Sequence, residues 1–138
     1  MKIYRYVCMV LVLLFAATGL LFLFIPGQVL AFFNHYSPSL GMPLSPVTGY
    51  NFYLILAVGY MYLVTVLAFF MYRHPNNKIY PQLLAHAKIA SSVFSLALFL
   101  LYAHYLIFLA NFLIDGFIGA LVITLYFKKG KVVPWVYS

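Results

Sequence analysis

Four continuous apolar stretches, each about 20 residues long, constrain what this chain can fold into. They cover residues 6–25, 53–72, 83–102 and 106–127. A helix of this length crosses the roughly 30 Å hydrocarbon core of a bilayer. Backbone groups in lipid must bond internally, and the runs do not alternate every second residue as in a barrel. We therefore predict an all-α integral membrane protein, a four-transmembrane-helix bundle.

Composition supports this interpretation. Apolar residues make up 67 % of the 138 residues and charged residues only 7 %, too few to cover a soluble protein of this size. We expect one membrane domain, 1–138, with a tail over 128–138. The short link 73–81 and the tight turn 103–105 predict two antiparallel hairpins.

The loop 26–52 is the longest segment outside the predicted spans. The spacing of Val29, Leu30, Phe32 and Phe33 predicts a short helix lying in the membrane interface, with Gln28, Asn34 and His35 facing water. Two interpretations stay open. The helix is either an apolar flap over the outer end of the bundle or a membrane anchor for the loop.

The basic residues predict the orientation of the chain. All but one of them fall before the first span, between the second and third spans, or after the fourth: Lys2, Arg5, Arg73, Lys78, Lys128, Lys129 and Lys131. Cytoplasmic loops carry such an excess, so both termini are expected in the cytoplasm. The net charge of +7 is then an orientation signal, and nucleic acid is not an expected partner.

Asp115 is the one acidic residue of the chain and lies in the middle of the fourth span. A carboxylate at that depth usually faces the bundle interior and has a partner. Lys88 is the basic residue at comparable depth. Counted from the turn near His104, the two differ by roughly 7–8 Å along the helix axes at 1.5 Å per residue, which a lysine side chain can largely cover. We predict a Lys88–Asp115 pair.

Polar and small residues surround both members of the predicted pair. Asn111 lies four residues before Asp115, while Ser92 and Ser95 follow Lys88 at helical spacing. Ser and Asn bond across helix interfaces in membranes. The network either locks the third span to the fourth or forms a proton or ligand site. His86 and Tyr60 are candidate neighbours of such a site.

Catalytic and metal sites are not predicted. The chain has one cysteine and one acid, and His86 and Asp115 are expected at different depths, which argues against a preformed Ser–His–Asp triad. No carboxylate or thiol would complete a metal site at the outer histidines. No cofactor is predicted. Haem or quinone binding near His86 is a weaker alternative.

Several segments resemble small DoxX-like, four-helix bacterial inner-membrane proteins. They are residues 19–26 at the end of the first span, 73–77 in the link, Lys88, and 115–119 in the fourth span. The resemblance covers most of the chain in short pieces. It implies a four-helix bundle in the plasma membrane.

The sequence favours a non-catalytic accessory or scaffolding subunit of a larger membrane complex. Its expected partners are the lipid bilayer and other membrane subunits or a second copy. The alternative is a small transporter, channel or lipophile-binding protein that uses Lys88 and Asp115. A redox subunit binding haem or quinone is weaker still. An enzyme is not expected.

Overall fold

The computed structural model describes residues 2–49 and 51–130, and the described part is helical without strands. Its elements are α1 (Lys2–Phe24), α2 (Pro26–Tyr36), a 3-10 turn η1 (Pro38–Leu40), α3 (Asn51–Arg73), α4 (Ile79–Leu101) and α5 (Leu106–Gly130). Four of these helices are long and apolar enough to cross a membrane. The predicted all-helical class is thereby confirmed. Residues 131–138 of the predicted tail lie outside the described residues.

The long helices begin and end within four residues of the predicted limits, and α1 and α4 both begin four residues early. α4 begins at Ile79, four residues before the predicted apolar stretch, and includes Pro81 in its first turn. The first N–H groups of a helix have no partner within it, so proline costs little there. Asn77 supports this start, because its Oδ1 accepts a hydrogen bond from the Ile79 N–H at 2.9 Å.

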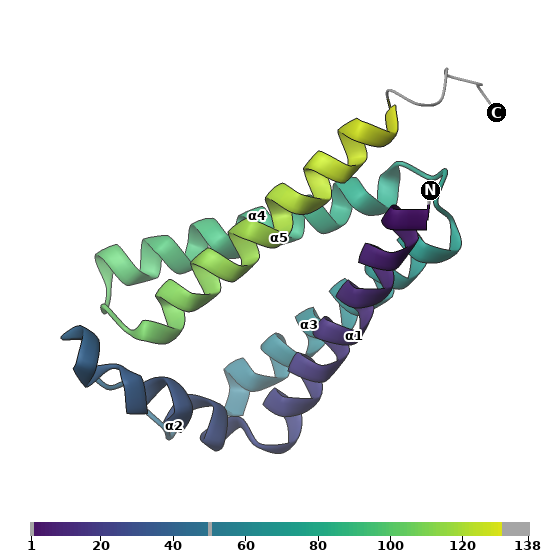
Figure 1. Ribbon diagram of the computed structural model, residues 1–138. Coiled ribbons are helices and arrows are strands. Elements are labelled where there is room, and N and C mark those ends of the chain that lie inside the picture. Colours follow the sequence, from purple (N-terminus) through teal and green to yellow (C-terminus); the bar gives the residue numbers. More distant parts are fainter. Residues whose placement is uncertain (1, 50, 131–138) are drawn as a thin grey trace.

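The four long helices pack as two closely associated pairs, α1 with α3 and α4 with α5 (Figure 1). Glycines mark the tightest approaches. A Cβ on Gly19 of α1 would lie 3.1 Å from the Met61 Cβ of α3, and one on Gly116 of α5 would lie 2.9 Å from the Ser92 Oγ of α4. Absent side chains let membrane helices approach closely, which increases dispersion contacts between them.

Buried apolar residues gather at one end of the bundle, which we call the closed end. It holds the start of α1 and the link between α3 and α4 (Figure 1). Tyr4, Cys8, Leu11 and Phe15 are buried on α1, at spacings of one helical face. They belong to one core cluster with residues of the other long helices: Val64, Ala68, Met71, Leu84, Ala85, Ile118 and Val122.

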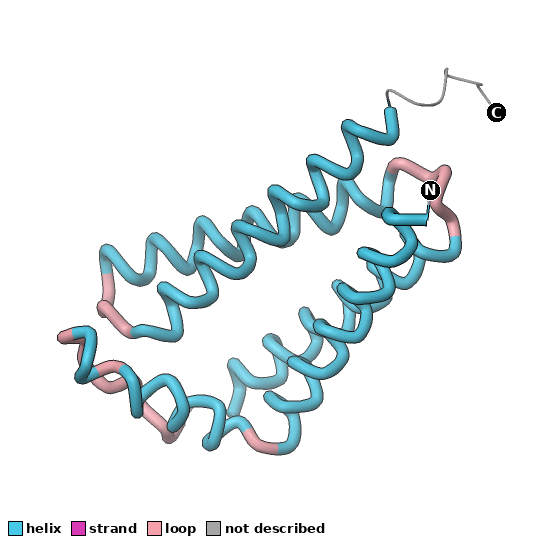
Figure 2. The backbone as a smooth tube through the Cα atoms, viewed as in Figure 1, coloured by secondary structure: helices cyan, strands magenta, loops and turns pink. Residues whose placement is uncertain are grey.

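The opposite end, which we call the open end, carries α2 and the turn 102–105 (Figure 2). None of the residues 16–24, 53–63, 96–101 and 106–114, which lead to this end along the four long helices, is buried. All four long helices also carry large apolar side chains that are exposed. In the most apolar windows of the long helices only 17–28 % of residues are buried. Such a surface suits contact with lipid rather than water.

α2 forms within the predicted interfacial segment, but one of its polar residues lies differently from the prediction. Gln28 and His35 are exposed, whereas Asn34 is half-buried. Its Oδ1 accepts from the Ser45 N–H at 2.8 Å, and its Nδ2 donates to the Ser45 carbonyl at 2.9 Å. The prediction that Asn34 faces water is wrong, because its amide matches both backbone groups of Ser45 and fastens the following loop to α2.

Candidate functional site: a charged pair beneath an apolar cavity

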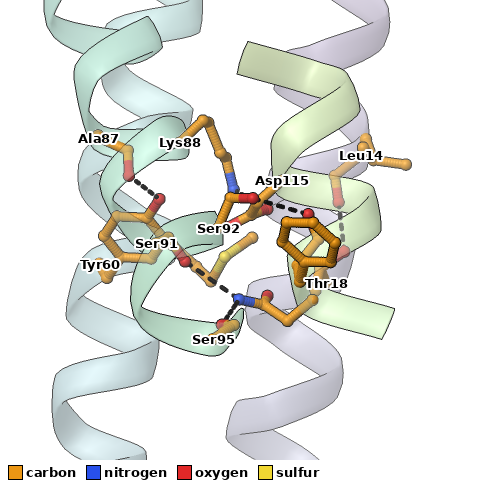
Figure 3. Close-up of polar contacts among 12 residues, drawn as sticks. Leu14, Thr18, Tyr60, Ala87, Lys88, Ser91, Ser92, Ser95 and Asp115 are labelled. Carbon is orange, nitrogen blue, oxygen red and sulfur yellow. Dashed lines mark hydrogen bonds and ion pairs between the residues drawn. The ribbon is translucent and has the colours of Figure 1, made fainter. Parts of the chain in front are cut away.

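Lys88 and Asp115 form a buried ion pair between α4 and α5 (Figure 3). Lys88 Nζ donates to Asp115 Oδ1 at 2.8 Å, and the side chains are only 2 % and 5 % exposed. The lysine side chain therefore covers the axial offset directly. Without its partner, either charge would be very costly at this depth, so the pair couples the two helices.

Aromatic rings from the other two long helices surround the Lys88 ammonium. Nζ lies 4.5 Å from the ring centre of Phe15 on α1 and 5.1 Å from that of Tyr60 on α3. Ring faces attract cations, and more strongly where water is excluded. The Tyr60 hydroxyl donates to the Ala87 carbonyl at 3.1 Å, which fixes the ring beside Lys88. All four long helices thus contribute a side chain to this one point.

A set of neutral hydrogen bonds continues the α4–α5 contact toward the open end (Figure 3). Ser92 Oγ donates to the Phe112 carbonyl at 2.8 Å. Asn111 Nδ2 donates to Ser95 Oγ at 2.6 Å and to Ser91 Oγ at 3.1 Å. Ser91 was not among the predicted site residues. Its spacing of four residues from Ser95 places both hydroxyls on one helix face, which is the signal that could have found it.

The second carboxylate oxygen of Asp115 has no hydrogen-bond partner within residues 2–49 and 51–130, although it is buried. Leaving a buried polar atom unsatisfied costs about 1–3 kcal/mol, and more for a charged group. Native structures rarely leave such an atom without a protein, water or ligand partner. Asp115 Oδ2 is therefore an acceptor with unused capacity.

A cavity of about 480 Å³ lies above the ion pair, and both Lys88 and Asp115 line it. Its volume falls in the roughly 300–1,000 Å³ range of small-molecule sites. The lining comes from α1, α2 and α5, with Met61 of α3 and Lys88 of α4. It is mostly aliphatic and aromatic: Leu14, Phe15, Leu21, Phe22, Ile25, Val29, Phe32, Phe33, Met61, Ile107, Ala110, Ile114 and Ile118. The cavity was not predicted from the sequence, because no residue pattern indicates where two helices are too far apart to pack.

The polar groups of the cavity wall are few, and most are already engaged. Thr18 Oγ1 donates to the Leu14 carbonyl at 2.8 Å within α1. Both hydrogen bonds of Asn111 Nδ2 go to the serines of α4. Gln28 of α2 is exposed and lines the cavity from the interfacial helix. The cavity is therefore apolar along most of its wall, with the charged pair as its floor.

α2 covers part of this cavity. Gln28, Val29, Phe32 and Phe33 line it, and α2 contacts both α1 and α5. Of the two interpretations of the interfacial helix, this arrangement favours the flap over the outer end. An anchor would need only lipid beneath its apolar face.

His86, predicted as a possible neighbour of the ligand site, is not part of this cavity. It is exposed on α4, where its Nδ1 lies 2.7 Å from the Gln82 carbonyl oxygen. It lines a smaller depression of about 280 Å³ together with Tyr126 and Phe127 of α5. Two residues of separation on a helix place His86 and Lys88 on different faces.

The described part of the chain holds no group of three His, Cys, Asp or Glu side chains that could bind a metal ion. No protein-family model, curated protein or solved structure matches the chain. The DoxX-like resemblance therefore stays a prediction, and functional inference depends on the geometry of the cavity and its floor.

Proposed function

We propose that this chain is a membrane protein that binds a small lipophilic molecule in the cavity above Lys88 and Asp115. One observation carries the proposal: the buried ion pair borders an apolar cavity of about 480 Å³. A pair with only a structural role needs no space beside it, because protein interiors are otherwise closely packed with few voids.

The lining indicates where a ligand would come from. Leu14 and Leu21 of α1, together with Ile114 of α5, line the cavity and are about half exposed. In a membrane such exposed apolar surface contacts acyl chains. A lipophile can then reach the cavity laterally from the bilayer, between α1 and α5, while α2 shields the open end from water.

Two substitutions of the same kind on α5 test the proposal. Ala110→Phe fills the cavity, whereas Ala120→Phe adds the same ring at an exposed position outside it. We expect native mass spectrometry of protein purified in mild detergent to find a retained lipophile on the wild type and on Ala120→Phe, but not on Ala110→Phe. Equal retention by all three would overturn the proposal, as would a wild-type protein without bound lipophile.

The same purification tests the accessory role that the sequence favours. An accessory subunit predicts a stoichiometric larger membrane complex after native pull-down. A monomer or homo-oligomer that retains a lipophile would instead support the binding function. The transporter alternative adds a further requirement, because the bound molecule would have to exchange between the two sides of the membrane.

The proposal includes the membrane topology. We place the four-helix bundle, two antiparallel hairpins, in the plasma membrane with both termini cytoplasmic. The supporting observation is that the link between α3 and α4 lies at the same end of the bundle as the start of α1 (Figure 1), and that both segments carry or adjoin basic residues. Reporter fusions after the link and after the turn 102–105 test it, with cytoplasmic and outer signals expected respectively. Reversed signals would overturn this orientation.

A further inference from the structure

We propose that the cavity selects a neutral amphiphile whose head group is a hydroxyl, and that this hydroxyl donates its hydrogen bond to Asp115 Oδ2. The inference deepens the proposed function and rests on it. It starts from two independent observations, the apolar cavity lined by Asp115 and the buried carboxylate oxygen that has no partner in the described part of the chain.

The floor of the cavity offers an acceptor and little else. Lys88 Nζ is already held by Asp115 Oδ1 and by the rings of Phe15 and Tyr60. The nearby donors of Asn111 and Thr18 are also used. A head group that must accept strong hydrogen bonds, such as a carboxylate or an amide carbonyl, would remain unsatisfied there. A hydroxyl needs only to donate.

Charge balance excludes ionised head groups. Lys88 and Asp115 neutralise one another at 2.8 Å. An amine would add a second cation beside Lys88, and a carboxylate would add a second anion beside Asp115. Either would leave a net charge where water is excluded, which is strongly unfavourable. A neutral hydroxyl adds a hydrogen bond to a charged acceptor without changing the balance.

The carboxylate can meet such a head group without disturbing the ion pair. Asp115 is held through Oδ1 alone. The terminal torsion of an aspartate side chain is broad rather than confined to narrow wells, so the carboxylate can turn at low cost. Both oxygens move together, and the flexible Lys88 side chain follows Oδ1 and keeps the ion pair while Oδ2 turns toward the cavity. The apolar tail of the ligand would then lie along α1 and α5, and α2 would cover its distal end.

Photo-crosslinking with matched probes tests the inference. Decan-1-ol, decanoic acid and decylamine, each with a diazirine at the same chain position, are added to the protein in nanodiscs, and labelled peptides are identified by mass spectrometry. We expect the alcohol to label the cavity-lining peptides of α1 and α5 about tenfold more than the other two probes, the effect of one hydrogen bond to a charged group. Ala110→Phe should abolish this labelling and Ala120→Phe should retain it.

The possible results separate this inference from the proposed function. Equal cavity labelling by all three probes would overturn the hydroxyl preference and leave lipophile binding supported. Preference for the acid would overturn it too, because Lys88 would then be the recognising group. Labelling that is absent from the cavity, or unchanged by Ala110→Phe, would overturn both.

A double variant tests the role of Asp115 itself. Lys88→Met together with Asp115→Leu replaces the pair by apolar side chains, an exchange that buried ion pairs often tolerate. We compare decan-1-ol with its methyl ether, a neutral probe that has no hydroxyl to donate. The wild type should prefer the alcohol about tenfold, whereas the folded double variant should retain cavity labelling and label equally with both. A preference that persists in it would overturn the assignment to Asp115. If the double variant does not fold, the probe series on the wild type decides the inference alone.

Discussion

The closed and open ends of the bundle use similar apolar helices in different ways. At the closed end Leu11, Met71 and Leu84 are almost fully buried in one cluster, whereas at the open end Leu21 and Ile114 of the cavity wall are about half exposed. Lipid is as apolar as leucine, so helices in a membrane gain no hydrophobic free energy by closing together. Packing and hydrogen bonds decide where they meet.

The ion pair lies at the boundary between the two ends. Phe15 is the buried residue of α1 that lies nearest the open end, and Asp115 is the buried residue of α5 that lies nearest that end. From these two residues toward the open end, the α1–α3 pair and the α4–α5 pair are separated by the cavity. The charged pair therefore has two roles: it connects the four long helices, and it keeps a carboxylate oxygen without a hydrogen-bond partner beside the cavity.

The largest expected effect comes from breaking the pair at this boundary. Lys88→Met leaves the Asp115 carboxylate buried beside two aromatic rings, so we expect a loss of about 3–5 kcal/mol in the free energy of unfolding. Equilibrium unfolding in mixed micelles of a mild detergent and SDS measures it. The Lys88→Met, Asp115→Leu double variant should recover most of the loss. A single variant as stable as the wild type would show that the four helices do not depend on this point.

Matched truncations compare the two ends directly. Leu84→Ala removes a fully buried side chain at the closed end and should cost about 2–4 kcal/mol, because the helices around it cannot collapse completely. Leu21→Ala removes the same atoms from the cavity wall, where the residue is 48 % exposed, and should cost less than about 0.5 kcal/mol. The same unfolding assay applies. Similar losses would mean that the open end is as tightly packed as the closed end.

A substitution in the contact between α4 and α5, next to the ion pair, should have a smaller effect on the free energy of unfolding. A Cβ on Gly116 would lie 2.9 Å from Ser92 Oγ, so Gly116→Ala must displace the hydroxyl that bonds the Phe112 carbonyl. We expect a loss of about 1–3 kcal/mol. Gly59→Ala on α3 meets nothing within 4 Å and serves as the control, with stability unchanged or raised by helix propensity. Equal behaviour of the two variants would contradict the close approach.

The helices and the charged pair could be predicted from the sequence, but the cavity could not. Helices follow from local hydropathy and backbone chemistry, and Lys88 with Asp115 follows from the cost of lone charges at depth. The cavity depends on where α1 and α5 diverge, which no single segment encodes. Helical spacing alone could have predicted that His86 and Lys88, two residues apart, lie on different faces of α4. The hydrogen bonds between Asn34 and Ser45 could not have been predicted, because they join α2 to a residue of the irregular segment that follows it.

The smallest expected effect on stability concerns these hydrogen bonds at the open end. Asn34→Ala removes three hydrogen bonds to Ser45, all outside the long helices, so the free energy of unfolding should fall by no more than about 1 kcal/mol. Local opening of α2 and the following loop should increase instead. Hydrogen exchange over residues 37–49 should become faster in Asn34→Ala, with α4 and α5 unchanged, while His35→Ala, which removes a neighbouring exposed side chain, should leave the exchange as in the wild type. Unchanged exchange in Asn34→Ala would mean that the cover over the cavity is held by the contacts of α2 with α1 and α5, and not by its own loop.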